Sequence, residues 1–230
     1  MATLYIVATP IGNLEDITLR AVRVLKEVQT IVAEDTRQTR KLLIHYGIEK
    51  PLFSLHEHSQ EAKVAGIIEK IKSGDVAYVV DAGTPGISDP GARLVQAVLS
   101  QEDIQVVPIP GTSSLTALLS IAGIPTDRFL FLGFLPKKKG RATLLRSIAE
   151  SPYPVVFFES PYRIMKTLEA LEKEGDFYCI VGRELTKKFE TIYRGKTEEV
   201  IEQLKKDKVR GEFTVIVQTQ NAKRKTKSVK

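Results

Sequence analysis

Short runs rich in valine and isoleucine alternate along the chain with longer segments in which apolar residues recur at helical spacing. Apolar runs of about four to eight residues are typical of strands buried on both faces, and helical spacing is typical of helices that cover a sheet. The alternation therefore predicts βαβ units and a parallel sheet. In the first half the predicted strands are Leu4–Ala8, Thr30–Ala33, Pro51–Leu55, Val76–Val80 and Val106–Ile109, and the predicted helices are Leu19–Val28, Arg37–Tyr46, Glu61–Ser73 and Ala92–Leu99.

The pattern breaks at the turn Pro110-Gly111 and again at Pro125-Thr126-Asp127, so we expect a domain junction near residues 110–115. The fold class is α/β with two domains: residues 1–112 with a five-stranded, mainly parallel sheet, and residues 113–219 with a mixed sheet. In the second half the predicted helices are Ser113–Ala122, Arg141–Glu150, Arg163–Glu174 and Glu198–Lys206, and the predicted strands are Val155–Phe158, Phe177–Val181, Glu190–Arg194 and Phe213–Gln218.

Lysine and arginine outnumber aspartate and glutamate by 34 to 28, a net charge of +6 that favours an anionic partner such as nucleic acid. Residues 220–230 are strongly basic, and we expect a solvated, disordered tail or an arm that touches RNA. Cys179 is the only cysteine, which excludes an intramolecular disulfide and a CxxC metal or redox site. The N-terminal apolar run is too short for a signal peptide and no stretch is long enough to span a membrane, so we expect a cytoplasmic protein with no membrane partner.

In open α/β sheets, ligands bind outside the carboxyl ends of the strands. The residues that follow the predicted strands are therefore candidates for chemistry: Thr9–Asn13, Glu34–Arg37, His56–His58, Asp81–Gly91 and Pro110–Ser114. Several are dense in glycine and proline, which is explained either by tight βα turns or by a main-chain grip on a flat adenine and ribose. Neither G-x-G-x-x-G after the first strand nor G-x-x-x-x-G-K-[ST] occurs, which argues against an ordinary dinucleotide fold and a P-loop NTPase.

Taken in order, these segments resemble one known family. The motifs that carry the resemblance are Ala8–Thr18, Glu34–Arg37, His56–His58, Asp81–Gly91, Gly133–Pro136, Phe158–Pro161, Arg183–Lys187 and Gly211–Phe213. They are similar to the tetrapyrrole methylase-like, class III S-adenosylmethionine-dependent methyltransferases over residues 3 to about 219. Within that family they are most similar to the group that acts on small-subunit ribosomal RNA.

The resemblance implies a fold, a cofactor and a reaction. S-adenosyl-L-methionine would lie in a cleft between the two domains of a homodimer subunit. The reaction would be 2′-O-methylation of a cytidine in the decoding region of 16S ribosomal RNA, offered as RNA or as the small ribosomal subunit. The positions that correspond to cofactor contacts are Pro10, Asp81, Gly83, Thr84, Ser88, Thr112, Ser113, Phe158, Glu159, Gly211, Glu212 and Phe213.

Two other functions stay open. A small-molecule methyltransferase that acts on a tetrapyrrole precursor would share the fold. Porphyrin-pathway relatives commonly carry Gly-Asp-Pro and Tyr-Met where this chain has Gly83-Thr84-Pro85 and Phe158-Glu159, which points away from tetrapyrrole substrates. A non-catalytic RNA-binding module is the alternative outside enzymes.

Methyl transfer from a sulfonium is an in-line displacement, so the protein must position the 2′-oxygen and help to remove a weakly acidic proton. No metal is required for this chemistry. The base candidates near strand exits are Asp35, Glu34, His56, Lys187, His58 and Glu159, of which the lysine needs a lowered pKa. Contacts to RNA are expected from Arg37, His58, Arg183 and Lys188.

These assignments have structural alternatives. Asp35 or Thr36 can cap the helix that follows. His56 and His58 can make structural hydrogen bonds, or form a metal pair for which no cysteine is at hand. The basic segments after residue 183 and at Lys137–Arg141 can contact RNA phosphates or be solvated loops.

Overall fold

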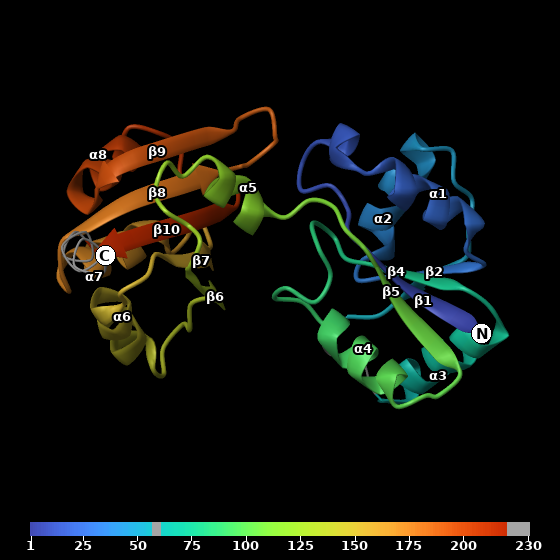
Figure 1. Ribbon diagram of the computed structural model, residues 1–230. Coiled ribbons are helices and arrows are strands. Elements are labelled where there is room, and N and C mark those ends of the chain that lie inside the picture. Colours follow the sequence, from blue (N-terminus) through green and yellow to red (C-terminus); the bar gives the residue numbers. More distant parts are fainter. Residues whose placement is uncertain (57–60, 220–230) are drawn as a thin grey trace. The chain divides into compact units, whose positions relative to one another are not determined.

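The computed structural model describes residues 1–56 and 61–219. Contacts along the chain divide it into two compact units, with the division between Ser113 and Ser114. Each unit has its own sheet and helices (Figure 1). Each also has its own hydrophobic core. No helix in the described ranges is long and apolar enough to cross a membrane.

Unit 1 contains a five-stranded sheet in which all neighbouring strands run parallel, which confirms the predicted fold class. The strands are β1 (Ala2–Val7), β2 (Thr30–Ala33), β3 (Leu52–Ser54), β4 (Val76–Val79) and β5 (Ile104–Ile109), in the order β3-β2-β4-β1-β5. The chain moves outward from β1 through β2 to β3 and then returns through β4 to β5. Because all five strands are parallel, their carboxyl ends lie at one edge of the sheet, where ligands bind in such folds.

Four helices cover the two faces of this sheet: α1 (Leu19–Glu27), α2 (Thr36–His45), α3 (Glu61–Ser73) and α4 (Gly91–Leu99). Parallel crossovers are right-handed, so the reversal of direction after β3 places α1 and α2 on one face and α3 and α4 on the other (Figure 1). Leu25 of α1 and Ile71 of α3 are fully buried in the cores of these two faces. A short 3₁₀ segment, η1 (Leu14–Asp16), joins β1 to α1.

Unit 2 contains a mixed five-stranded sheet, as predicted, in the order β6-β7-β10-β8-β9. Its elements are α5 (Ser114–Ser120), β6 (Leu130–Phe134), α6 (Arg141–Glu150), β7 (Val155–Glu159), α7 (Ile164–Glu172), β8 (Phe177–Arg183), β9 (Thr191–Lys196), α8 (Thr197–Lys205) and β10 (Phe213–Thr219). β6 and β7 are parallel, whereas β10 runs antiparallel to both β7 and β8. The strand that comes last in the described sequence is therefore the middle strand of the sheet.

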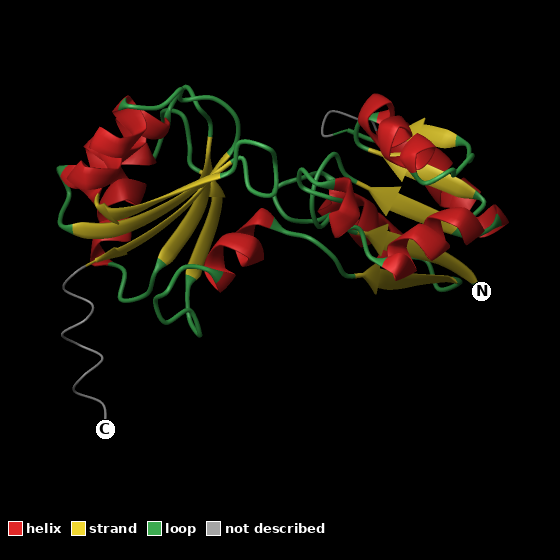
Figure 2. Cartoon of the chain, turned by 90° about the horizontal axis from the view of Figure 1, so that it is seen from above, coloured by secondary structure: helices red, strands yellow, loops and turns green. Residues whose placement is uncertain are grey.

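Helices α6, α7 and α8 cover one face of this sheet, and α5 packs on the other (Figure 2). Alternate residues of the strands, such as Phe157, Val181 and Val215, form the core beneath the three helices. On the opposite face Gly182 leaves room for α5, because a Cβ there would lie 2.9 Å from Leu118 Cδ1. Successive residues of a strand point to opposite faces of the sheet. The core beneath α6, α7 and α8 and the packing against α5 therefore use different residues of the same strands.

The sequence pattern predicts four strands in unit 2 and misses β6. The residues of β6, Leu-Phe-Leu-Gly-Phe, include no valine or isoleucine, and Gly133 has φ +59°, which interrupts the strand alternation. β6 is also an edge strand, with Leu130 and Phe134 exposed. It therefore lacks the continuous apolar run by which a central strand is recognised.

Candidate functional site

Three strand exits of unit 1 are joined by hydrogen bonds into one surface. Thr9, after β1, and Gly83, after β4, form an antiparallel bridge in which each backbone N–H donates to the other's carbonyl at 3.0 Å. The hydroxyl of Thr112, after β5, donates to the carbonyl of Thr9, and the hydroxyl of Thr84 donates to the carbonyl of Thr112 at 2.9 Å. We call these four residues the threonine cradle. Its polar groups are backbone amides, carbonyls and hydroxyls, with no charge.

Two glycines allow these backbones to come close. Gly83 has φ +86°, a conformation that side chains disfavour, and a Cβ there would lie 3.4 Å from Ile11 Cγ2. A Cβ on Gly111 would lie 2.9 Å from the Cβ of Ala8, closer than real Cβ contacts. The two glycines are therefore required by the close approach of the turns to each other.

The segment that follows β4 is held in shape by one carboxylate. Asp89 accepts hydrogen bonds from the backbone N–H groups of Gly86 and Ile87 at 2.9 Å and of Gly91 at 2.7 Å. Ser88, in the same segment, is exposed and has φ 64°. A non-glycine residue in this conformation costs on the order of 1–3 kcal/mol and persists where its surroundings determine it. The loop thus presents Ser88 to solvent in a fixed, strained conformation.

Acidic residues from two neighbouring strands meet at the same edge of unit 1. Glu34 and Asp35 follow β2, and Asp81 follows β4, the strand beside it. The backbone N–H of Asp35 donates to Asp81 Oδ1 at 3.1 Å, and the backbone N–H of Asp81 donates to Glu34 Oε2 at 3.4 Å. Burial raises the pKa of Asp81 above its usual value. The structure therefore gathers three of the predicted site residues.

Asp35 both caps a helix and pairs with Arg37. Its Oδ1 accepts the backbone N–H of Arg37 at 2.8 Å, which makes it the N-cap of α2, and its Oδ2 lies 2.6 Å from Arg37 Nη2. The hydrogen-bonded Arg37 guanidinium lowers the pKa of Asp35 to about 2. The Arg37 side chain is 87% exposed, so a phosphate can reach it. Asp35 is therefore the cap of α2, and Arg37 beside it is an exposed cation.

The remaining candidate residues of unit 1 are His56, His58, Pro10 and Ser113. His56 is exposed and follows β3, the neighbour of β2, whereas His58 lies outside the described residues. Pro10 is buried and Ser113 is half-buried. Within residues 1–56 and 61–219, no three side chains of histidine, cysteine, aspartate or glutamate gather as a metal site requires.

The candidate residues of unit 2 lie together where β7 and β8 end and β10 begins. Phe213, at the start of β10, pairs with Glu159 at the end of β7 and with Arg183 at the end of β8. Gly211, just before β10, has φ +89°, and a Cβ there would collide with the Glu184 side chain. Three motifs that are distant in sequence are therefore adjacent, because β10 lies between β7 and β8.

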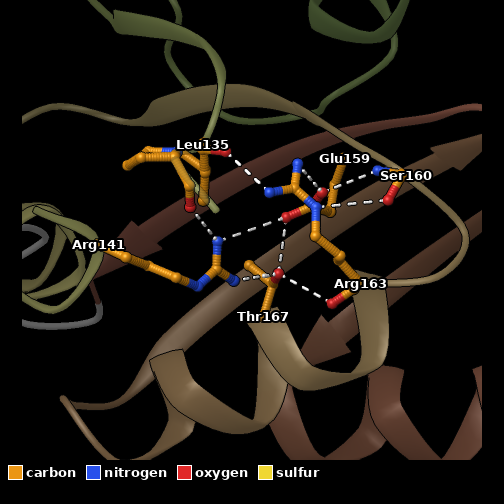
Figure 3. A network of polar contacts seen from close by, with 7 residues as sticks. Leu135, Arg141, Glu159, Ser160, Arg163 and Thr167 are labelled. Atoms are coloured by element: carbon orange, nitrogen blue, oxygen red, sulfur yellow. Dashed lines mark hydrogen bonds and ion pairs between the residues drawn. The ribbon is translucent and has the colours of Figure 1, made fainter. Parts of the chain in front are cut away.

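Glu159 is buried in a network of polar contacts (Figure 3). Its carboxylate lies 2.7 Å from Arg163 Nη2 and 3.8 Å from Arg141 Nη1. The hydroxyl of Thr167 donates to it at 2.7 Å, and the backbone N–H of Ser160 donates at 2.8 Å. The carboxylate is thus engaged inside unit 2, which leaves the backbone of Glu159 for any contact with a cofactor.

Sequence reasoning misses the partners of Glu159. Arg163 and Thr167 lie one helical turn apart where the predicted helix Arg163–Glu174 begins, and a polar pair on an inner helix face is a usable signal. Arg141 lies on a different helix, and nothing in the local sequence links it to Glu159.

The basic residues after β8 differ from the expectation. Lys187 pairs with Glu184 at 2.9 Å and with Glu212 at 3.0 Å. Burial lowers the pKa of Lys187, but the two carboxylates outweigh burial, so the pKa is raised. A base would need the opposite shift, so this geometry does not support Lys187 as a base.

Arg183 and Lys188 also differ from each other. Arg183 is buried, and its Nη1 pairs with Asp207 and donates to the Tyr193 hydroxyl at 3.2 Å. This geometry does not favour a contact between Arg183 and RNA. Lys188, in contrast, is exposed.

Residues 3–201 match the family model of the tetrapyrrole (corrin/porphyrin) methylases, and the chain belongs to this family. Several curated relatives are named Ribosomal RNA small subunit methyltransferase I. One from Thermotoga maritima is 46% identical over 94% of this chain and 98% of its own length. One from Bacillus subtilis is 46% identical over 96% of this chain and 76% of its own length. These matches group the chain with that branch of the family.

Solved structures share the fold. Diphthine synthase superposes with a TM-score of 0.74 at 15% identity, over 97% of this chain and 94% of that one. The methyltransferase CobJ gives 0.70 at 18% identity, over 96% and 95%. Uroporphyrin-III C-methyl transferase from Thermus thermophilus, complexed with S-adenyl homocysteine, gives 0.64 at 21% identity, over 94% and 96%. At these identities the likeness establishes the fold alone.

Proposed function

We propose that this chain transfers a methyl group from S-adenosyl-L-methionine to the ribose 2′-hydroxyl of a cytidine in the decoding region of 16S ribosomal RNA. The name shared by relatives at 45–46% identity supports a small-subunit ribosomal RNA substrate. The motifs at the strand exits support transfer to the 2′-hydroxyl through their resemblance to the family. The structural observation that carries the proposal is an uncharged backbone cradle beside a group of carboxylates at one sheet edge.

The threonine cradle fits a cofactor without phosphate. The exits of β1, β4 and β5 contain no lysine or arginine over residues 9–13, 81–91 and 110–114, so a phosphate would find no cation there. A carboxylate such as Asp81 can accept hydrogen bonds from ribose hydroxyls. When bound, the cofactor supplies an electrophilic methyl group on a positively charged sulfur. The first-unit residues proposed to hold it are Pro10, Asp81, Gly83, Thr84, Ser88, Thr112 and Ser113.

The family resemblance also supports cofactor contacts from the second unit. These positions lie at the shared edge of β7 and β10. For Glu159 we propose a backbone contact, because its carboxylate is engaged by arginines. The second-unit residues in the proposal are Phe158, Glu159, Gly211, Glu212 and Phe213.

Asp35 is the proposed base, and its pKa depends on whether it is paired with Arg37. In the structure Arg37 holds the pKa of Asp35 at about 2, too low for an effective base. An RNA phosphate that binds the exposed guanidinium would draw it away from Asp35. The carboxylate would then regain a higher pKa and a free oxygen for the 2′-hydroxyl proton, and the neighbouring acids Glu34 and Asp81 would favour that rise. Glu34 and His56 are the alternative bases at this edge.

The proposed RNA contacts are the exposed cations Arg37 and Lys188. Family resemblance further supports a homodimer that acts in the cytoplasm. Among the described residues Arg183 is paired inside unit 2, so we leave it out of the RNA contacts.

The test incubates the purified protein with methyl-labelled S-adenosyl-L-methionine and small ribosomal subunits that lack the modification. Nuclease digestion and mass spectrometry then locate the label. A single 2′-O-methylcytidine in the decoding region is the expected result. Cofactor binding without labelled RNA would contradict the proposal and favour a small-molecule methyltransferase. RNA binding without cofactor binding would instead favour a non-catalytic module.

A further inference from the structure

An irregularity in β6 builds an aromatic cluster at the edge of the second sheet. On a regular strand Phe131 and Phe134 would point to opposite faces, because their positions differ by an odd number. The register between β6 and β7 shifts between these two residues, where Gly133 has φ +59°. Both rings consequently pack edge-on against Phe158, with centroids 5.1 and 5.4 Å from its ring. Bulges commonly re-aim a side chain in this way.

Phe134 is the most exposed ring of this cluster. Phe134 is 58% exposed, whereas Phe131 and Phe158 are half-buried. The neighbouring ring of Phe158 supports Phe134 from within the unit. A flat partner can therefore stack on Phe134 without a large loss of side-chain freedom.

The loop that follows β6 is anchored by two arginines (Figure 3). Arg163 Nη1 donates to the carbonyl of Leu135 at 2.9 Å, and Arg141 Nη1 donates to the carbonyl of Pro136 at 3.1 Å. The backbone N–H of Arg141 also donates to the carbonyl of Lys138 at 3.2 Å, which closes the turn before α6. The loop is therefore held at both ends.

Three consecutive lysines lie in this loop. Lys137, Lys138 and Lys139 are exposed, and none of them makes an ion pair or side-chain hydrogen bond within the described residues. Residues 135–146 contain five lysines and arginines and no aspartate or glutamate. Lys187, in contrast, is held by two carboxylates. A polyanion can bind the loop lysines without first breaking ion pairs.

We propose that Phe134 and Lys137–Lys139, the aromatic–lysine surface, bind a single-stranded segment of RNA. A base would stack on Phe134, and backbone phosphates would contact the lysines. Single-strand sites combine these two features because every base offers a flat face and every nucleotide a phosphate. The inference rests on the proposed function and adds that the RNA is single-stranded where it contacts this surface.

Fluorescence anisotropy without cofactor tests this surface, with a labelled single-stranded RNA of about 12 nucleotides. F134A is expected to weaken binding about tenfold, the scale of one stacked base. K137A/K138A is expected to weaken binding and to reduce the slope of log affinity against log salt by about 1.4, since each phosphate contact on a single strand contributes about 0.7. A duplex of the same sequence should lose affinity in K137A/K138A and keep it in F134A, because its bases are already stacked.

Y153A and K206A/K208A are matched controls. They remove an exposed aromatic ring and two exposed lysines from unit 2 outside this surface. Both are expected to bind single-stranded RNA like the unchanged protein. Equal affinities for all four variants would overturn the inference, even where small subunits are still methylated.

Two further outcomes distinguish RNA binding at this surface from self-association and from methyl transfer. If F134A alters the sedimentation mass and leaves RNA affinity intact, Phe134 belongs to a contact between copies and the inference fails. If the two surface variants lose RNA affinity as expected while the unchanged protein methylates no RNA, the surface stands and the proposed function fails.

Discussion

The carboxylate of Glu159 lies 2.7 Å from the guanidinium of Arg163, and the two side chains are 0% and 22% exposed. This ion pair joins three segments, because Glu159 ends β7, Arg163 precedes α7, and Arg163 also holds the carbonyl of Leu135 after β6. Glu159, which family resemblance assigns to a cofactor contact, thus also holds three segments of unit 2 together.

Glu159→Gln is expected to lower the free energy of unfolding of unit 2 by about 3 kcal/mol, because it leaves two largely buried arginines without a counter-charge. Cys179 reports on this unit: it is the only cysteine, it is fully buried, and burial raises the pKa of its thiol to about 11. Thiol labelling in urea should therefore begin at a lower urea concentration in the variant. Glu169→Gln, at an exposed position of α7, is the control. Equal labelling midpoints would contradict the prediction.

Asp35→Asn is expected to lower the single-turnover rate of methyl transfer by about 10²- to 10⁴-fold, the usual contribution of a general base. Asparagine is a good N-cap, so α2 should keep its start. Cofactor affinity, measured by calorimetry, should be nearly unchanged. Glu34→Gln and His56→Ala are compared in the same assay. A full rate in Asp35→Asn, with a loss in one of the others, would move the base to that residue.

Arg37→Ala is expected to raise the pKa of Asp35 from about 2 toward 3.8, its ordinary value. Since the pKa of Asp35 is lower in the folded chain than its ordinary value, the pair stabilises the fold above pH 3.8, and this contribution is lost as the pH falls through about 2. Carboxyl-carbon NMR during a pH titration measures the shift. Lys41→Ala, at an exposed position of the same helix, should leave it unchanged. A pKa still near 2 in Arg37→Ala would show that another group holds the carboxylate in its ionised form.

Gly83→Ala is expected to weaken S-adenosyl-L-methionine binding at least about tenfold, which is about 1.4 kcal/mol. Gly86→Ala is the matched control, since the two glycines have φ +86° and +92° and alanine at either position costs roughly 1–2 kcal/mol of backbone strain. A Cβ on Gly83 meets Ile11 and Thr112, whereas one on Gly86 meets nothing within 4 Å. Calorimetric titration compares the two variants. Equal losses of affinity would indicate that the threonine cradle is not the cofactor site.

The fold is predictable where each element carries its own pattern. All four residues of β4 are buried, so the strand reads as a continuous apolar run. β6 breaks that rule in two ways, because Gly133 bends the strand and one side of it has no partner strand. Its place in the sheet depends on pairing with β7, which no local pattern records.

The candidate site is predictable to the extent that it follows from strand order. Parallel strands end at one edge, so the exits of β2 and β4 bring Asp35 and Asp81 together. The raised pKa of Lys187 is only partly visible in the sequence, because Glu184 lies three residues earlier but Glu212 comes from the start of β10. Tertiary contacts of this kind set a pKa, and residue type alone does not.

The central position of β10 also sets an order of assembly. The pairs β6-β7 and β8-β9 have no hydrogen-bonded contact with each other until residues 213–219 join them. Unit 1 has its last strand at Ile104–Ile109 and can fold while the rest of the chain is still being synthesised. A nascent second unit, in contrast, carries unpaired inner strands that invite pairing with other chains. Pairing of β10 therefore covers the inner edges of β7 and β8 together.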